Sequence, residues 1–240
     1  MSPDIERKKV REMFSKIAPT YDLLNHSLSF GLDFYWRKKA VRHLYDNAVA
    51  SPVFLDLATG TGDVVLEILR QTKFLQKKSK VRVIGLDFAY PMLGIGKSKA
   101  SKKLLDCNFI QGDALCLPFR DSSFDGIIVS FGFRNFQSRE EGLGEMSRVI
   151  RPGAPIVILE FGNPRGIWGT AFNFYFKCIL PILGRLFSGH RDAYSYLPAT
   201  VSEFPVPNET KKLIAKHGFR DVTVHSVTGG VANIFVGISS

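Results

Sequence analysis

Short apolar runs alternate with longer amphipathic stretches between residues 53 and 162, which predicts βα repeats around a parallel sheet. Apolar and β-branched residues fill five runs of strand length, at 53–57, 81–87, 108–113, 124–131 and 155–161. The stretches between them predict helices at 63–71, 90–102 and 139–150, the last of which is stopped by Pro152-Gly153.

Two more apolar runs, DVTVHSVT and VANIFVGI, follow a predicted helix at 209–217 and are separated by Gly229-Gly230. Two strands joined by a two-glycine turn predict an antiparallel hairpin at one edge of the sheet. Residues 1–50 are predicted to be helical and to lie outside the sheet, as a cap over a pocket. The predicted fold class is therefore α/β: a Rossmann-like sheet of the class I methyltransferase type, mostly parallel, with a C-terminal antiparallel hairpin and an N-terminal helical cap.

Net charge and cysteine content limit the partners and the cellular compartment that we expect for this protein. A formal net charge of +10 over 240 residues favours attraction to nucleic acid, an acidic substrate or an anionic membrane face. The three cysteines lack CxxC spacing, so neither a disulfide framework nor a metal site is expected. The charged N-terminus does not read as a secretory signal, and we expect a cytoplasmic protein. The apolar-rich stretch from Ile167 to Phe187 contains Asn173, Lys177 and Pro181, which makes it a poor spanning helix but a candidate interfacial element.

A glycine turn, Asp56-Leu-Ala-Thr-Gly60-Thr-Gly62-Asp63, joins the first predicted strand to the first predicted helix. At Gly60 and Gly62 the backbone can turn tightly and let a ligand approach, which predicts a nucleotide-type site. A plain turn is the competing interpretation. Against it, Asp87 closes the next strand 25 residues beyond Gly62, where an acidic residue meets ribose hydroxyls in such folds, and Asp113 closes the third.

The residues after the turn distinguish between cofactors. A dinucleotide requires a third glycine to seat its pyrophosphate on the helix N-terminus, whereas this chain has Asp63-Val64-Val65. A carboxylate there repels phosphate and suits a cofactor that carries a sulfonium and an amino group. The turn therefore favours S-adenosylmethionine over NAD.

Separated segments resemble the ubiquinone/menaquinone biosynthesis C-methyltransferase family. They are the stretch from Tyr21-Asp22 to Trp36, the turn DLATGTGD, SFGFRNF at 130–136, RVIRPGAPIVILEF at 148–161 and YLPATVSEFP at 196–205. The family pattern differs at Asp33, where histidine is usual, at Ala154, where a second glycine is usual, and at Gly162, where Ser or Thr is common. These departures bear on substrate preference more than on reaction type. Ala58 stands where methyltransferases in general have a glycine, but the family that the chain resembles tolerates alanine there.

The resemblance implies the residues of a site. Cofactor contacts are expected at Thr61, Asp87, Asp113, Ala114 and Ser130, beside the Asp56, Gly60 and Gly62 of the turn. The substrate is expected to be a polyprenylated hydroquinone. The chain length fits a single methyltransferase domain over residues 1–240, composed of the cap (1–50), a cofactor-binding core (51–162) and a substrate-side region (163–240).

The reaction expected from this resemblance is methyl transfer from S-adenosylmethionine to a ring carbon of demethylmenaquinol. The ring becomes nucleophilic when a hydroquinone hydroxyl, with a pKa near the phenolic value of about 10, loses or shares its proton. Arg134 is the candidate to stabilise the phenolate, with Asn135, Tyr21 and His26 as orienting or proton-accepting groups. The alternative interpretation of residues 21–26 is a polar cluster that ends a helix.

Other functions and partners stay open. One alternative is C-methylation of a polyprenyl methoxy-benzoquinol in ubiquinone biosynthesis, and another is RNA-directed methylation. The chain lacks an aromatic-interleaved basic motif, so no nucleic acid partner is expected. Cationic runs such as Arg37-Lys38-Lys39 are either solvated helix faces or a peripheral contact with the inner face of the membrane. A homodimer is also left open.

Overall fold

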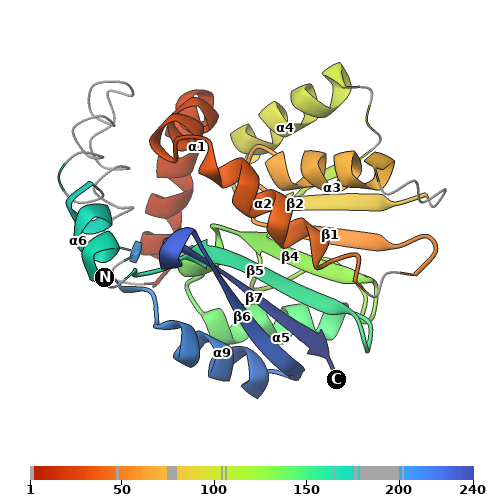
Figure 1. The fold of residues 1–240 in the computed structure, drawn as a ribbon. Coiled ribbons are helices and arrows are strands. Elements are labelled where there is room, and N and C mark those ends of the chain that lie inside the picture. Colours follow the sequence, from red (N-terminus) through yellow and green to blue (C-terminus); the bar gives the residue numbers. More distant parts are fainter. Residues whose placement is uncertain are drawn as a thin grey trace.

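Seven strands form one sheet in the order β3-β2-β1-β4-β5-β7-β6 (Figure 1). The computed structural model describes residues 3–46, 49–74, 80–103, 105, 107–164, 166–175, 178, 200–201 and 203–240. The strands are β1 Val53–Leu57, β2 Arg82–Asp87, β3 Asn108–Gln111, β4 Gly126–Ser130, β5 Pro155–Phe161, β6 Phe219–Val227 and β7 Ala232–Ser239. The first five pair in parallel, and β7 is antiparallel to both β5 and β6, so the predicted fold class is confirmed.

The helices occupy the stretches between the strands, as the sequence predicts. They are α1 Pro3–Leu28, α2 Leu32–Arg42, α3 Asp63–Phe74, α4 Tyr90–Lys102, α5 Arg139–Val149, α6 Gly166–Phe174 and α9 Pro207–Lys216. Three strands are shorter than predicted: β2 begins one residue later, and Asp113 and Phe124 form only isolated bridges beyond the ends of β3 and β4. The hairpin connection is a 3-10 turn in which Gly229 and Gly230 take positive φ, at 64° and 92°. A Cβ at Gly162 would collide with the carbonyl oxygen of Gly230, which accounts for the glycine at that position.

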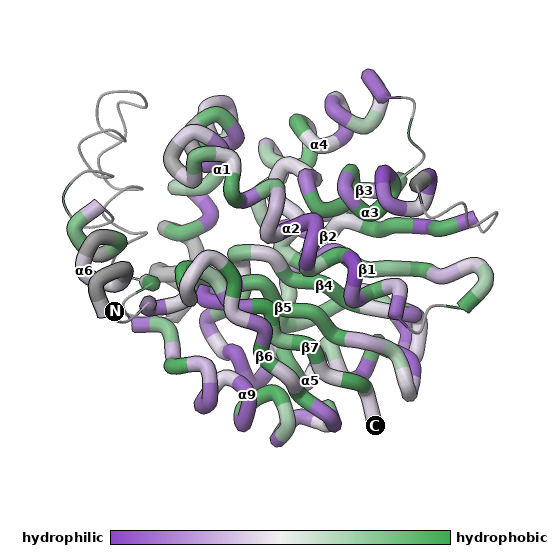
Figure 2. The backbone as a smooth tube through the Cα atoms, in the orientation of Figure 1, coloured by the Kyte–Doolittle hydropathy of each residue, from purple (hydrophilic) through white to green (hydrophobic). Residues whose placement is uncertain are grey.

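Alternate residues of the central strands point to opposite faces of the sheet. Ile128 and Val157 pack with side chains of α2, α3 and α4, whereas Ile127 and Ile156 pack with side chains of α5 and α9. Figure 2 shows the strands as largely hydrophobic and the helices as mixed. Because helices cover both faces of the sheet, a ligand approaches it at the carboxyl ends of the strands.

The two N-terminal helices lie outside the sheet. α1 packs on α4, and α2 packs on α3 and β5. The indole of Trp36 in α2 donates a hydrogen bond to the Thr228 hydroxyl at the hairpin turn, at 2.8 Å. Of the stretch 167–187, the structure describes α6, Tyr175 and Cys178, and the rest lies outside the described residues. None of the helices within the described ranges combines the length and the apolarity that crossing a bilayer requires.

Candidate active site

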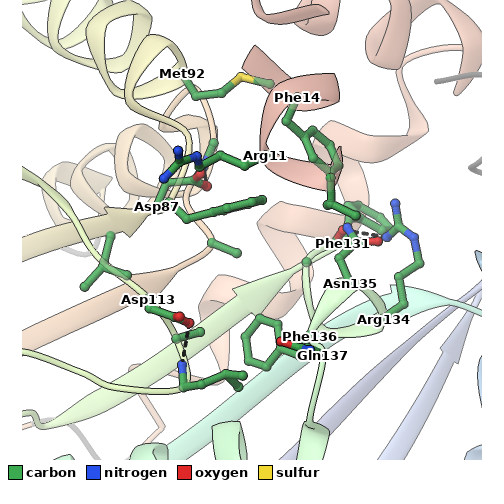
Figure 3. A pocket seen from close by; sticks show the side chains of 18 of the residues that line it. Arg11, Phe14, Asp87, Met92, Asp113, Phe131, Arg134, Asn135, Phe136 and Gln137 are labelled. Atoms are coloured by element: carbon green, nitrogen blue, oxygen red, sulfur yellow. Dashed lines mark hydrogen bonds between the residues drawn. The ribbon is translucent and has the colours of Figure 1, made fainter. Parts of the chain in front are cut away.

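A cavity of about 860 Å³ lies at the carboxyl edge of the sheet. Its walls come from α1, the glycine turn, and the loops that follow β2, β3 and β4. Figure 3 shows Asp87 and Asp113 on one side and Arg134 and Asn135 on the other. Eight of the residues singled out in the sequence line it, namely Tyr21, Gly60, Asp87, Asp113, Ala114, Ser130, Arg134 and Asn135. His26, Asp56, Thr61 and Gly62 do not line it.

The glycine turn has two parts with different functions. Gly60 faces the cavity with a φ of 57°. Gly62 has a φ of 80° and lies behind the turn, where a Cβ would come within 2.8 Å of the Phe109 ring. Ala58 also has a positive φ, of 57°, a backbone region in which residues other than glycine are uncommon. The departure from glycine at Ala58 is therefore accommodated with local backbone strain beside the cavity.

Asp87 and Ser130 offer buried polar groups at the acidic side of the cavity. The Asp87 carboxylate accepts hydrogen bonds from the backbone N–H groups of Gly60 and Ala89, each at 2.8 Å. Burial raises the pKa of Asp87 to about 6, although these hydrogen bonds oppose the shift. The Ser130 hydroxyl is buried and has no hydrogen-bond partner among the described residues. A ligand with hydroxyl or amino groups would satisfy both.

Asp56 lies beneath the turn rather than in the cavity wall. One carboxylate oxygen accepts a hydrogen bond from the Thr59 hydroxyl at 2.5 Å, and the other has no partner among the described residues. Burial raises the pKa of Asp56 to about 7, and the nearby charge of Asp87 adds to the shift. Asp56 therefore holds the turn through Thr59 and does not belong to the lining of the cavity.

Arg134 is fixed by an ion pair in the loop after β4. Its guanidinium donates to the Glu160 carboxylate at 2.7 Å and to the carbonyl oxygen of Phe131 at 2.5 Å. The same carboxylate accepts the backbone N–H groups of Arg134 and Phe161. Glu160 is fully buried, so the pair compensates a charge that would otherwise be unpaired in the core. Arg134 thus holds the loop in addition to facing the cavity.

Tyr21 extends from α1 into the cavity. Burial raises the pKa of Tyr21, while Arg134, Arg37 and a hydrogen bond with Asn25 oppose the rise. Its ring lies 4.0 Å from the position that a Cβ on Gly60 would occupy. The phenol is therefore protonated at neutral pH and lies between the glycine turn and Arg134, where it can donate a hydrogen bond.

His26 belongs to a separate group of charges that joins α1 and α2 to α3 and α4. We call it the ion cluster, and its members are Asp22, His26, Asp33, Arg37, Asp63 and Lys99. Lys99 lies 2.5 Å from Asp22 and 2.7 Å from Asp63, and the Thr61 hydroxyl donates to Asp22 at 2.5 Å. The carboxylate of Asp63 is therefore directed to Lys99 and Arg37 and not, as the turn had suggested, to the cavity.

The α2 end of the ion cluster includes the departure at Asp33. His26 Nδ1 lies 2.6 Å from the Asp33 carboxylate, which also pairs with Arg37 and accepts the Ser29 hydroxyl. Burial alone would raise the pKa of Asp33, but its hydrogen bonds and Arg37 hold it at about 2. The imidazole stacks on Phe34 with a centroid distance of 4.2 Å. His26 is thus placed to hold two helices together, away from the cavity lining.

Some residues of the cavity were not singled out in the sequence. Val10, Arg11 and Phe14 of α1 line it, as do Phe88 and Met92. Nothing local in a predicted cap helix indicates which of its faces meets the pocket. Glu160 could have been identified from the sequence, because a charged residue within an apolar strand has to be paired when it is buried.

Comparisons with known sequences place the chain among quinone-pathway methyltransferases. A sequence model described as the ubiE/COQ5 methyltransferase family matches residues 3–239. A demethylmenaquinone methyltransferase of Thermus thermophilus is 46% identical over 226 residues, which cover 94% of this chain and 99% of the relative. A ubiquinone/menaquinone biosynthesis C-methyltransferase of Geobacter sulfurreducens is 43% identical over 233 residues, 96% of this chain and 88% of the relative.

Solved structures support the fold. A methyltransferase of Thermotoga maritima, described as SAM-dependent and as a possible histamine N-methyltransferase, superposes with a TM-score of 0.64 at 15% identity. The match covers 95% of this chain and 99% of that chain. A phosphoethanolamine N-methyltransferase of Haemonchus contortus, solved with S-adenosyl-L-methionine, gives a TM-score of 0.60 at 13% identity over 84% of this chain and 52% of that chain.

Proposed function

The chain belongs to the ubiE/COQ5 methyltransferase family, and on that premise we propose that it transfers a methyl group from S-adenosylmethionine to a ring carbon of demethylmenaquinol, giving menaquinol. The observation that carries the proposal is the arrangement of the cavity. The side with Asp87 and Asp113 suits a cationic nucleoside cofactor, and the other side presents Arg134 and Asn135. Tyr21 also lines the cavity. Both reactants can therefore meet in one cavity, where proximity supplies much of the rate.

The residues present fit S-adenosylmethionine. Asp87 would accept hydrogen bonds from the ribose hydroxyls, and the Ser130 hydroxyl, which has no hydrogen-bond partner among the described residues, would supply a further group. The ends of β3 and β4 add Asp113, Ala114 and Ser130 to one wall of the cavity, and Gly60 keeps the turn free of a side chain. When bound, the cofactor would supply an electrophilic methyl group with S-adenosylhomocysteine as the leaving group, and the ring carbon that accepts the methyl would lose its proton to water.

The other side of the cavity activates and orients the quinol. The Arg134 guanidinium stabilises negative charge on a hydroquinone oxygen, and Glu160 fixes the position of that guanidinium. Asn135 and the protonated Tyr21 orient the ring by hydrogen bonding. His26 acts indirectly, since the ion cluster holds the helix that carries Tyr21. The prenyl chain of such a substrate places the enzyme at a membrane surface, on the inner face, as a peripheral protein.

The test is incubation with methyl-labelled S-adenosylmethionine and either demethylmenaquinol or a demethylated polyprenyl methoxy-benzoquinol. We expect label in menaquinol, and a Tyr21→Phe variant that binds the cofactor normally but turns over more slowly. Label only in the benzoquinol would assign the chain to ubiquinone biosynthesis. If neither quinol accepts label although the cofactor binds, the proposal is wrong.

A further inference from the structure

Exposed hydrophobic side chains gather where α1 meets α2. Nine large hydrophobic residues are exposed among those that the structure describes, and three of them, Val49, Tyr90 and Val206, lie elsewhere. The other six form what we call the apolar corner: Leu23, Phe30, Leu32, Phe34, Tyr35 and Phe174. Leu23 lies in the last two turns of α1, and three of the six residues lie in the first turn of α2. Phe174 precedes Tyr175, whose ring centroid lies 5.6 Å from that of Phe30. Such grouping is uncommon on a surface that faces only water.

The backbone at the corner holds its most exposed aromatic residue at a cost. Phe30 is 77% exposed and has a φ of 52°, and Gly31 follows with a φ of 73°. A left-handed conformation is an outlier for a bulky residue and costs about 1 kcal/mol or more. Packing in the core does not repay this cost, because most of the ring faces solvent. A strained and exposed phenylalanine is therefore better explained by a contact outside the chain.

Cations border the apolar corner. Along α2 the exposed face changes from Phe34 and Tyr35 to Lys38 and Arg42, which lie one turn apart on that face. The Lys39 ammonium lies over the ring of Tyr35, 4.9 Å from its centroid.

On the other side of Phe34 is a hollow of about 390 Å³ that is also lined by Lys73 and Lys103. Its acidic residues already have cations, since Glu67 pairs with Arg70 and Asp63 pairs with Lys99. The corner therefore combines an apolar tip with a positively charged border.

We propose that the apolar corner inserts into the surface of an anionic phospholipid bilayer, with Leu23 and Phe30 among the acyl chains and Lys38 and Arg42 at the phosphate groups. An apolar tip bordered by cations matches the order of layers at such a surface. The inference rests on the proposed function for its purpose, because a prenylated quinol is held in a bilayer.

The position of the corner connects it to the cavity. α1 carries Leu23 and also the cavity residues Phe14 and Tyr21. Beneath α1, the apolar cluster that contains Ile17 and Met92 continues to Tyr175, which contacts Phe30. Docking at the corner thus brings the α1 wall of the cavity next to the bilayer, along an apolar surface that suits an isoprenoid chain.

The experiment is co-sedimentation of the full chain with vesicles of phosphatidylcholine, with and without phosphatidylglycerol. One variant, Leu23→Gln with Phe30→Asn, removes the tip, and asparagine tolerates the left-handed φ. We expect it to bind both kinds of vesicle about tenfold more weakly or worse. A second variant, Lys38→Gln with Arg42→Gln, should lose up to about thirty-fold in affinity on anionic vesicles alone.

Matched controls separate the corner from general surface chemistry. Val49→Ser removes an exposed apolar side chain next to the amino end of β1, and Lys211→Gln with Lys212→Gln removes two cations from α9. Both should bind vesicles as the wild type does. The inference is overturned if the wild-type protein does not bind anionic vesicles, or if the corner variants bind these vesicles as tightly as the control variants do. It is also overturned if the tip variant converts a dimer to a monomer in sedimentation velocity, because a second copy would then cover the corner.

Activity assays keep this inference distinct from the proposed function. The tip variant should methylate a demethylated naphthoquinol without a prenyl chain at the wild-type rate, and should lose activity only on prenylated quinol in vesicles. Equal loss on both substrates would contradict a docking role. If no form of the protein methylates any quinol, the proposed function fails, while the vesicle measurements still decide the surface.

Discussion

Arg134→Ala is expected to remove a counter-charge from the protein core as well as a group from the cavity. Glu160 is fully buried and accepts hydrogen bonds from the Arg134 guanidinium at 2.7 Å, and from the backbone N–H groups of Arg134 and Phe161 at 3.1 and 2.9 Å. After the substitution both backbone donors stay, but the charge of Glu160 is no longer compensated.

The magnitude follows from breaking a buried ion pair on one side. Removal of one partner typically costs about 3–5 kcal/mol, and the two surviving backbone donors place this case near about 3 kcal/mol. For a chain of this size that corresponds to a fall in Tm of about 6–12 °C. The double variant, Arg134→Met with Glu160→Gln, removes both charges and keeps the volume, so most of the lost stability should return.

Urea denaturation measures these free energies of unfolding when it is followed by circular dichroism and, in a Trp168→Phe background, by the fluorescence of buried Trp36. Trp36 reports on the region, since its ring packs near Phe131 and Phe161. A loss of less than about 1 kcal/mol in Arg134→Ala would refute a stabilising role for this ion pair, as would a double variant that is no more stable than the single one.

Methyl transfer by the double variant then separates structure from chemistry. If Arg134 stabilises a phenolate, the refolded double variant stays slow, with cofactor affinity nearly unchanged. If activity returns with stability, Arg134 serves only to hold the loop after β4.

Three further predictions follow from buried and paired charges. The pKa of Asp56 is raised to about 7, so the folded state binds more protons than the unfolded state between about pH 4 and pH 7. The free energy of unfolding therefore falls as pH rises through that window, by at most about 4 kcal/mol. The difference between the free energies of unfolding at pH 5 and pH 7.5 should be smaller for Asp56→Asn than for the wild type, and an unchanged difference would count against the raised pKa. Asp87 has a pKa of about 6, so calorimetry should show S-adenosylmethionine binding that weakens below pH 6, and a flat profile would exclude Asp87 as the acceptor. Lys99→Met leaves the carboxylates of Asp22 and Asp63 without their shared cation. Amide hydrogen exchange in α1 should therefore be faster than in a Lys97→Met control, which changes another lysine of α4. Equal exchange in the two variants would show that the ion pairs of Lys99 do not hold α1.

The periodicity of the sequence predicts most of the fold because both faces of the sheet are buried. Runs such as VFLDL and PIVILEF have no polar face, and helices on either side are the ordinary way to cover them. The errors lie at strand ends: Phe124 is apolar enough to extend β4, but the chain there pairs only with Ile150. The hydropathy of the residues does not specify at which position the hydrogen-bonded pairing between two strands ends.

The candidate site was predictable as far as it depends on strand ends. Asp87, Asp113 and Ser130 meet at one edge because parallel strands all end there. His26 lies outside the cavity lining, because its direction is set by contacts with Asp33 of α2 and Asp63 of α3, which no local pattern specifies. For the same reason the sequence did not separate Thr61, which bonds Asp22, from Gly60, which faces the cavity.

The order of the strands in the sheet also determines which parts of the protein can fold while the chain is being synthesised. β7 is the last of the seven strands along the chain, yet it lies between β5 and β6. Until residues 232–239 have left the ribosome, β5 presents an open edge and β6 has no neighbour in the sheet. The hydrogen bond from Trp36 of α2 likewise cannot form until Thr228 at the hairpin turn has been synthesised. A nascent chain can therefore assemble β1 to β5 early but cannot close its cap until the hairpin is made, and an interrupted chain would expose an apolar strand edge that chaperones and proteases recognise.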